Sequence, residues 1–144
     1  MMISATVPPE LLFGYEIGCL RGPMLKNVVS TWQLPALQKI YGNNAYVKAY
    51  MAWDMHMLAF RFEVETKRIV VSYPAIEKGD AIELFIDTRN VKTARSTHRF
   101  YHHFFFLPER IEGVQCGECT HFRTEDRHSL ALAKDFHIQV EMTK

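Results

Sequence analysis

The Cys-x-x-Cys motif at Cys116 and Cys119 is the short pattern in this sequence whose residue types suit a metal site, because His121 follows two positions later. Thiolates at this spacing and an imidazole nitrogen are ligands that zinc accepts in a tetrahedral site. The motif indicates either a zinc site formed by Cys116, Cys119 and His121 or, more plainly, two reduced thiols in a loop. A fourth ligand could come from a partner chain or from another histidine. The histidines available are His98, His102, His103 and His128.

A second set of residues has types that suit a polar ligand such as a saccharide. Aromatic rings can stack on the apolar faces of sugar rings, while carboxylates and arginines bind the hydroxyl groups. If residues 81–87 and 99–107 form neighbouring strands, alternate side chains share one surface, which includes Phe85 and Phe105. The predicted ligand-binding residues there are Glu83, Asp87, Arg99, Tyr101 and His103. The alternative is a solvated sheet face whose aromatic rings cover a second layer.

Carboxylates suggest two further chemistries. Asp80, Glu83 and Asp87 could hold calcium, but they lie on a strand and not in a ligand-rich loop of the usual type. Glu83 and Asp87 could also act as a pair of acids, as in glycosidases. Four residues along a strand place them roughly 13 Å apart, which is too far for that chemistry.

Motifs of nucleophilic and phosphate chemistry do not occur in the sequence, which has no G-x-S-x-G, no H-E-x-x-H and no Gly-rich phosphate loop. The adjacent His102 and His103 would point to opposite faces of a strand, so they cannot act as a simple pair. We therefore expect a binding module and not an enzyme.

The elements that must position these residues are strands. Alternating apolar and polar side chains predict them at residues 45–53, 58–65, 82–87, 98–107 and 136–142, and β-branched residues predict a short one at 69–73. Turns are expected at 77–80 and 88–90, Pro108 should end its strand, and residues 125–134 could form one short helix or a single turn. Strands with one apolar face need a second sheet to cover them, so we predict an all-β, two-sheet antiparallel sandwich.

The composition limits the classes of function. The chain has 144 residues, which predicts a single domain, with an irregular arm over residues 1–40. Lys and Arg number 17 against 16 for Asp and Glu, so no strong field favours nucleic acid or a membrane surface. Three cysteines and no secretory or transmembrane segment make a cytoplasmic location the default expectation.

Two segments carry a family resemblance. Residues 45–54 and 58–64, A-Y-V-K-A-Y-M-A-W-D and L-A-F-R-F-E-V, resemble the A-x-V-x-x-x-W-D and L-Y-V-A-F-x-V hairpin of carbohydrate-binding module family 9-like domains. Residues 79–90, G-D-A-I-E-L-F-I-D-T-R-N, resemble that family's G-D-S-V-E-L-F-I-D-P-R-N strand and turn. Trp32 and the aromatic strand at 102–108 also fit, so the resemblance covers residues 31–108.

The resemblance implies a jelly-roll-like or immunoglobulin-like sandwich, saccharide binding without catalysis and, in some members, bound calcium. It does not extend to the aromatic residues that clamp the sugar. The family pattern continues with further strands, so we expect either a truncated chain or a shortened variant. A haem-binding sandwich of the DOMON type is another possibility because Met and His are plentiful, but no spacing identifies an axial pair.

Two functions follow as hypotheses. The first is a module that binds a carbohydrate or another polar ligand. The second is a structural or protein-interaction domain, which could be a homodimer formed through a sheet face that missing C-terminal strands leave uncovered.

Overall fold

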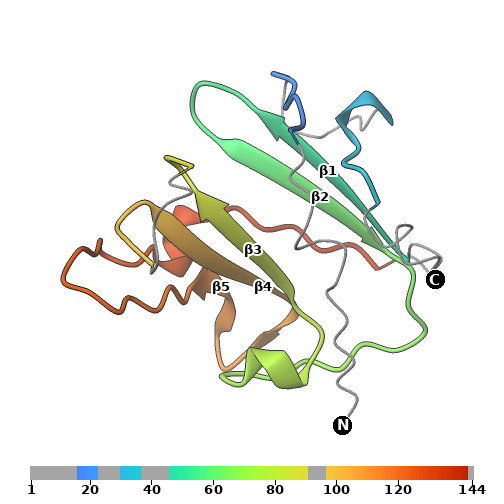
Figure 1. Ribbon diagram of the computed structural model, residues 1–144. Helices are drawn as coiled ribbons and strands as arrows, with labels where there is room; N and C mark the ends of the chain where they lie inside the picture. The colour runs from blue at the N-terminus through green and yellow to red at the C-terminus, as the bar shows by residue number, and fades with distance from the viewer. Residues whose placement is uncertain (1–15, 23–29, 37–45, 91–96, 143–144) are drawn as a thin grey trace, which may run out of the picture. The chain divides into compact units, whose positions relative to one another are not determined.

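The computed structural model describes residues 16–22, 30–36, 46–90 and 97–142. The chain divides into two compact units, Met1–Lys67 and Arg68–Lys144. The described part contains five strands in two antiparallel sheets, and its helical elements are short 3-10 turns (Figure 1). The predicted all-β fold with two antiparallel sheets is therefore confirmed. The packing of these sheets into one sandwich domain stays a prediction.

The described part of the first unit contains a β-hairpin, as the alternation predicted. Strands β1 (Val47–Trp53) and β2 (Leu58–Val64) pair from Val47 opposite Val64 to Trp53 opposite Leu58. Asp54 holds the turn, because its carboxylate accepts the backbone N–H groups of His56 at 2.7 Å and Met57 at 2.9 Å.

The described parts of the predicted N-terminal arm lie beside β1. Its residues 1–15, 23–29 and 37–40 fall outside the described residues. Arg21 forms a parallel bridge with Trp53, and Gln33, which follows η2 (Ser30–Trp32), forms an antiparallel bridge with Tyr50. The described arm therefore contributes isolated bridges to the hairpin.

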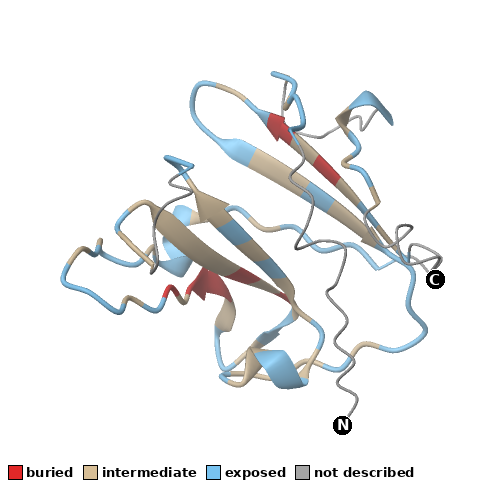
Figure 2. Ribbon diagram, in the orientation of Figure 1, coloured by how far each residue is buried: buried red, intermediate tan, exposed pale blue. Residues whose placement is uncertain are grey.

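The second unit contains a sheet with the strand order β3-β4-β5. Strand β3 (Ile82–Asp87) pairs with the central strand β4 (Tyr101–Ile111), which pairs with β5 (Val114–Glu118). Glu112 and Gly113 join β4 to β5 with positive φ angles of 50° and 83°, as the favoured two-residue hairpin turns require. Buried residues lie on β1, β4 and β5 and at Thr120 just after β5, and Leu107 of β4 is only 1% exposed (Figure 2).

The two faces of the β3-β4-β5 sheet carry different side chains. The register places alternate residues on the same side, so we name each face after its histidine. The His103 face comprises Glu83, Phe85, Asp87, Tyr101, His103 and Phe105. The His102 face comprises Ile82, Leu84, Ile86, His102, Phe104, Phe106, Cys116 and Glu118.

Two predicted strands are wrong, although the structure describes every residue of both. Residues 69–73 lie outside the sheets: the Val70 N–H donates to the Asp80 carboxylate, and the Val70 carbonyl accepts the Asp80 N–H. Residues 136–142 are not a strand either, yet Phe136 packs edge-on against Phe104 and Phe106 at ring distances of 5.4 and 5.7 Å. Apolar residues can thus cover a sheet without backbone pairing.

Two further expectations, for Pro108 and for Cys116, need correction, and of the two alternatives for residues 125–134 the single turn is the nearer one. Pro108 does not end β4, which continues to Ile111 through a register irregularity between Phe106 and Ile111, where a missing N–H is tolerated. Residues 125–134 form no α-helix, and a single 3-10 turn, η5 (Ala133–Asp135), overlaps their end. The segment that contains Cys116 is strand β5 and not a loop.

The expected turns are present. The 3-10 turn η4 (Ile76–Lys78) precedes Gly79, and a turn with Asn90 at φ 51° follows β3. Within the described residues, no helix has the length and apolar character that crossing a membrane would require.

Candidate functional site

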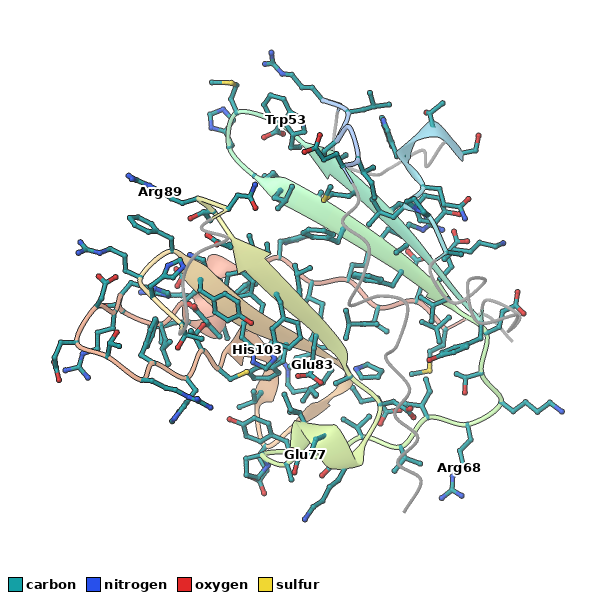
Figure 3. All side chains as sticks on the ribbon, in the orientation of Figure 1. Trp53, Arg68, Glu77, Glu83, Arg89 and His103 are labelled. Carbon is teal, nitrogen blue, oxygen red and sulfur yellow. The ribbon has the colours of Figure 1, made fainter. Side chains whose placement is uncertain are left out.

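The His103 face carries four of the five residues predicted to bind a ligand, namely Glu83, Asp87, Tyr101 and His103. Strands β3 and β4 are neighbours, as expected, with Phe85 opposite His103 and Asp87 opposite Tyr101. His103 Nε2 lies 2.7 Å from the Glu83 carboxylate, and Figure 3 shows both side chains on the sheet. A proton shared across this distance gives a charge-assisted hydrogen bond between neighbouring strands.

Phe85 is the exposed aromatic residue of this face. Its ring stacks on the His103 imidazole with 4.1 Å between centroids and 24° between planes, and Tyr101 lies beside it at 6.5 Å. Phe85 nevertheless remains 56% exposed. Burial raises the pKa of Tyr101, so its hydroxyl keeps its proton at neutral pH. The face thus combines an open apolar ring with a carboxylate, an imidazole and a hydroxyl group.

Asp87 and Arg99 are engaged in other contacts. Asp87 belongs to the same face, but its carboxylate accepts the Arg89 backbone N–H at 2.9 Å and lies 3.8 Å from His98 Nε2. Arg99 precedes β4, and its Nε donates to the Asp126 carboxylate at 2.5 Å. The compact group around Phe85 therefore consists of Glu83, Tyr101 and His103.

The structure does not assemble the predicted zinc ligands Cys116, Cys119 and His121. Cys116 is buried on the His102 face, where its Sγ lies 3.9 Å from the Ala133 carbonyl oxygen. Cys119 lies three residues further along, so in an extended segment its side chain points to the opposite face from Cys116. Its Sγ lies 3.6 Å from the His103 carbonyl oxygen. Burial raises the pKa of both thiols, which disfavours the thiolate that binds metal.

The carboxylates considered for calcium are also separate. Asp80 accepts the backbone N–H of Val70, Glu83 pairs with His103, and Asp87 lies in the turn after β3. Among the described residues, the group with ligand atoms close enough to hold one metal ion is a different one: His102, Glu118 and His128.

Glu118 is the centre of this cluster. Its side chain, at the end of β5, is 1% exposed. One carboxylate oxygen lies 3.1 Å from His102 Nδ1, 2.7 Å from His128 Nε2 and 2.6 Å from the Thr120 hydroxyl that donates to it. The other oxygen accepts the Ala131 backbone N–H at 2.8 Å.

The hydrogen-bond partners of Glu118 stabilise the negative charge on its carboxylate. Burial acts to raise the pKa of the carboxyl group, but the hydrogen bonds from Thr120, Ala131 and His128 outweigh it and leave the pKa below its usual value. Glu118 is therefore a buried anion at neutral pH.

Local packing orients His128. Its Nδ1 lies 2.8 Å from the Arg99 carbonyl oxygen, and Phe122 packs edge-on against its ring at 4.8 Å. His128 comes from the segment between β5 and η5, whereas His102 belongs to β4.

Sequence reasoning considered both of these histidines as a fourth ligand for the cysteine motif, and His102 also as a pair with His103, but it never combined them with each other and it missed Glu118. A usable signal was that Cys116, Glu118 and Thr120 are alternate residues, which in a strand point to the same face. If residues 116–120 pair with the His102 strand, these side chains share the face of that histidine.

No protein-family model, curated protein or solved structure matches this chain. The resemblance to carbohydrate-binding module family 9-like domains therefore stays a prediction from the sequence motifs.

Proposed function

We propose that this chain is a non-catalytic binding module for a saccharide or a similar polar ligand, which it holds on the His103 face. The observation that carries the proposal is the exposed Phe85 ring, stacked on His103 and flanked by the Glu83 carboxylate. An apolar platform edged by a few polar groups is the general pattern of small-molecule recognition.

Each group has a part in this proposal. The Phe85 ring packs against the C–H face of a pyranose ring, because the flat apolar surfaces match and both leave water. The Glu83 carboxylate accepts hydrogen bonds from sugar hydroxyl groups, and the Tyr101 hydroxyl adds a donor. His103 pairs with the Glu83 carboxylate, and its ring stacks against the Phe85 ring. The sequence resemblance to carbohydrate-binding domains favours a sugar among polar ligands.

A glycan array followed by calorimetric titration of the bound sugar tests the proposal. Covering the exposed part of a Phe side chain contributes about 1.5 kcal/mol or more, so Phe85→Ala should weaken binding by at least about tenfold. Glu83→Gln should weaken it as well, because the amide keeps the size of the carboxylate but loses its charge. The matched control is Met55→Ala, which removes an exposed apolar side chain from the other unit and should leave binding unchanged.

Three results would overturn the proposal. They are an array with no bound glycan, unchanged affinity in Phe85→Ala, and hydrolysis of the bound sugar, which would contradict the non-catalytic assignment. If no glycan binds and sedimentation instead shows a dimer that Phe85→Ala dissociates, the face is a protein-interaction surface.

A further inference from the structure

We infer that His102, Glu118 and His128 form a binding site for one divalent transition-metal ion, and that zinc is its expected occupant. This site is on the His102 face and does not depend on the saccharide proposal for the opposite face.

The donor set is the first argument. Two imidazole nitrogens and one carboxylate oxygen form a ligand set that zinc and other first-row ions use in proteins. The three ligand atoms lie within 4.8 Å of one another, and both histidine nitrogens approach the same Glu118 oxygen. Ligand atoms about 2.0–2.1 Å from a common zinc ion are themselves about 3.0–3.4 Å apart. Small side-chain adjustments are therefore enough to admit the ion.

The hydrogen-bond pattern of His128 is the second argument. The Arg99 carbonyl can only accept, so the 2.8 Å contact places a proton on His128 Nδ1. The other ring nitrogen, Nε2, lies 2.7 Å from the Glu118 carboxylate, so a cation, either a proton or a metal ion, must lie between these two atoms. Two electron pairs repel at this distance unless a cation lies between them. A metal ion satisfies both atoms, and so does a second proton on the ring.

The surroundings of the ligands favour the metal ion. In metal sites, a ligating histidine commonly donates its other N–H to a backbone carbonyl, and a ligating carboxylate is itself hydrogen-bonded. His128 has this arrangement through Arg99, and Glu118 has it through Thr120 and Ala131. A buried carboxylate also needs a compensating positive charge, which a divalent ion provides in full.

The site also joins three separate segments of the unit. Its ligands come from β4, from the end of β5 and from the segment before η5, so one ion would tie that last segment to the sheet. Bound metal should therefore stabilise the fold and raise the temperature of unfolding, since the ion binds the folded chain. The three protein ligands leave a further position of the ion open to water.

The test is a titration of chelator-treated full-length protein with zinc chloride, followed by calorimetry, with metal content measured by mass spectrometry after dialysis. We expect one zinc ion per chain. Loss of a residue that hydrogen-bonds a metal ligand costs about 10–100-fold in metal affinity, and loss of the ligand itself should cost more. His128→Ala, His102→Ala and Glu118→Gln should therefore each weaken zinc binding by at least about 100-fold. The matched controls are His103→Ala, on the same strand but the other face, and Cys119→Ser, and both should bind as the wild type does.

Cobalt(II) provides a second readout that does not require the variants to fold. Cobalt-loaded wild-type protein should show the visible bands of nitrogen and oxygen ligands, without the near-ultraviolet charge-transfer band of thiolate ligands. Absence of stoichiometric metal in the wild type would overturn the inference. So would a thiolate band, or metal-free protein in which nitrogen NMR shows His128 doubly protonated at neutral pH and unaffected by zinc.

Discussion

His102 and His103 are neighbours in the chain but belong to clusters on opposite faces of β4. The Nδ1 atom of His102 lies 3.1 Å from a Glu118 oxygen, whereas the Nε2 atom of His103 lies 2.7 Å from a Glu83 oxygen. The alternation of side chains along a strand predicts this separation. One sheet thereby presents two clusters of polar side chains, one on each face.

This separation predicts that the two sites respond independently to substitution. His103→Ala should weaken binding of the array-selected sugar and leave zinc affinity unchanged, and His102→Ala should have the converse effects. Calorimetric titration of both variants with both ligands measures this, with circular dichroism to verify folding. A folded variant that loses both ligands would contradict the assignment of two sites.

The burial of the cysteines makes a prediction about their reactivity. Burial raises the pKa of Cys116 and Cys119, and Cys116 is 5% exposed. Both thiols should therefore react with iodoacetamide at least about tenfold more slowly in the native protein than in urea. Mass spectrometry of timed samples gives the two rates, and equal rates would favour the loop expected from the sequence.

The fold of residues 70–80 predicts that replacing Gly79 destabilises the protein. A Cβ atom at this position would lie 2.6 Å from the Ser72 nitrogen and 2.8 Å from the Val70 oxygen, both backbone atoms that cannot easily move aside. Gly79→Ala should lower the free energy of unfolding by about 1–3 kcal/mol. The control is Gly18→Ala, which has open space around the added methyl group. Urea denaturation measures both variants, and equal midpoints would show that this backbone packing is wrong.

Asp54 predicts a pH dependence for the β1–β2 hairpin. The backbone N–H groups of His56 and Met57 donate to its carboxylate and lower its pKa below the usual 3.8. A lowered folded-state pKa means that the charged form stabilises the hairpin above the unfolded-state pKa, and this contribution is lost as the pH falls through the folded-state value.

An NMR titration of the Asp54 carboxyl carbon measures this pKa directly. Asp54→Asn should remove this contribution to the acid sensitivity of the hairpin, because the amide does not titrate. A pKa at or above the usual value would contradict the turn geometry.

The sequence predicted correctly those strands in which alternating apolar residues also form backbone pairs with a neighbouring strand. The β1–β2 hairpin has alternating residues on both strands with the Asp54 break between them, and β3 is bounded by the turns at 77–80 and 88–90. The same alternation wrongly predicted a strand at 136–142. Alternation indicates which side chains are apolar enough to be buried, but it does not determine which backbone groups form hydrogen bonds. Phe136 reaches the sheet without being part of it.

Alternation of apolar and polar residues could not predict strand β5 or the cluster of His102, Glu118 and His128. Glycine disfavours a strand, but Gly117 lies against the Phe105 ring, where an added Cβ would be only 3.1 Å from a ring carbon. The Glu118 site further depends on the β4–β5 register and on the position of His128, which belongs to no strand. Neither is encoded in local periodicity.

The central claim, that the His103 face binds the ligand, is tested most directly by amide NMR shift mapping of the wild-type protein. On titration with the array-selected sugar, the saturable shift changes should concentrate at Glu83, Phe85, Tyr101 and His103, while the hairpin residues 47–64 remain unchanged. Shift changes confined to residues 47–64, or no saturable change at the four face residues, would contradict the claim.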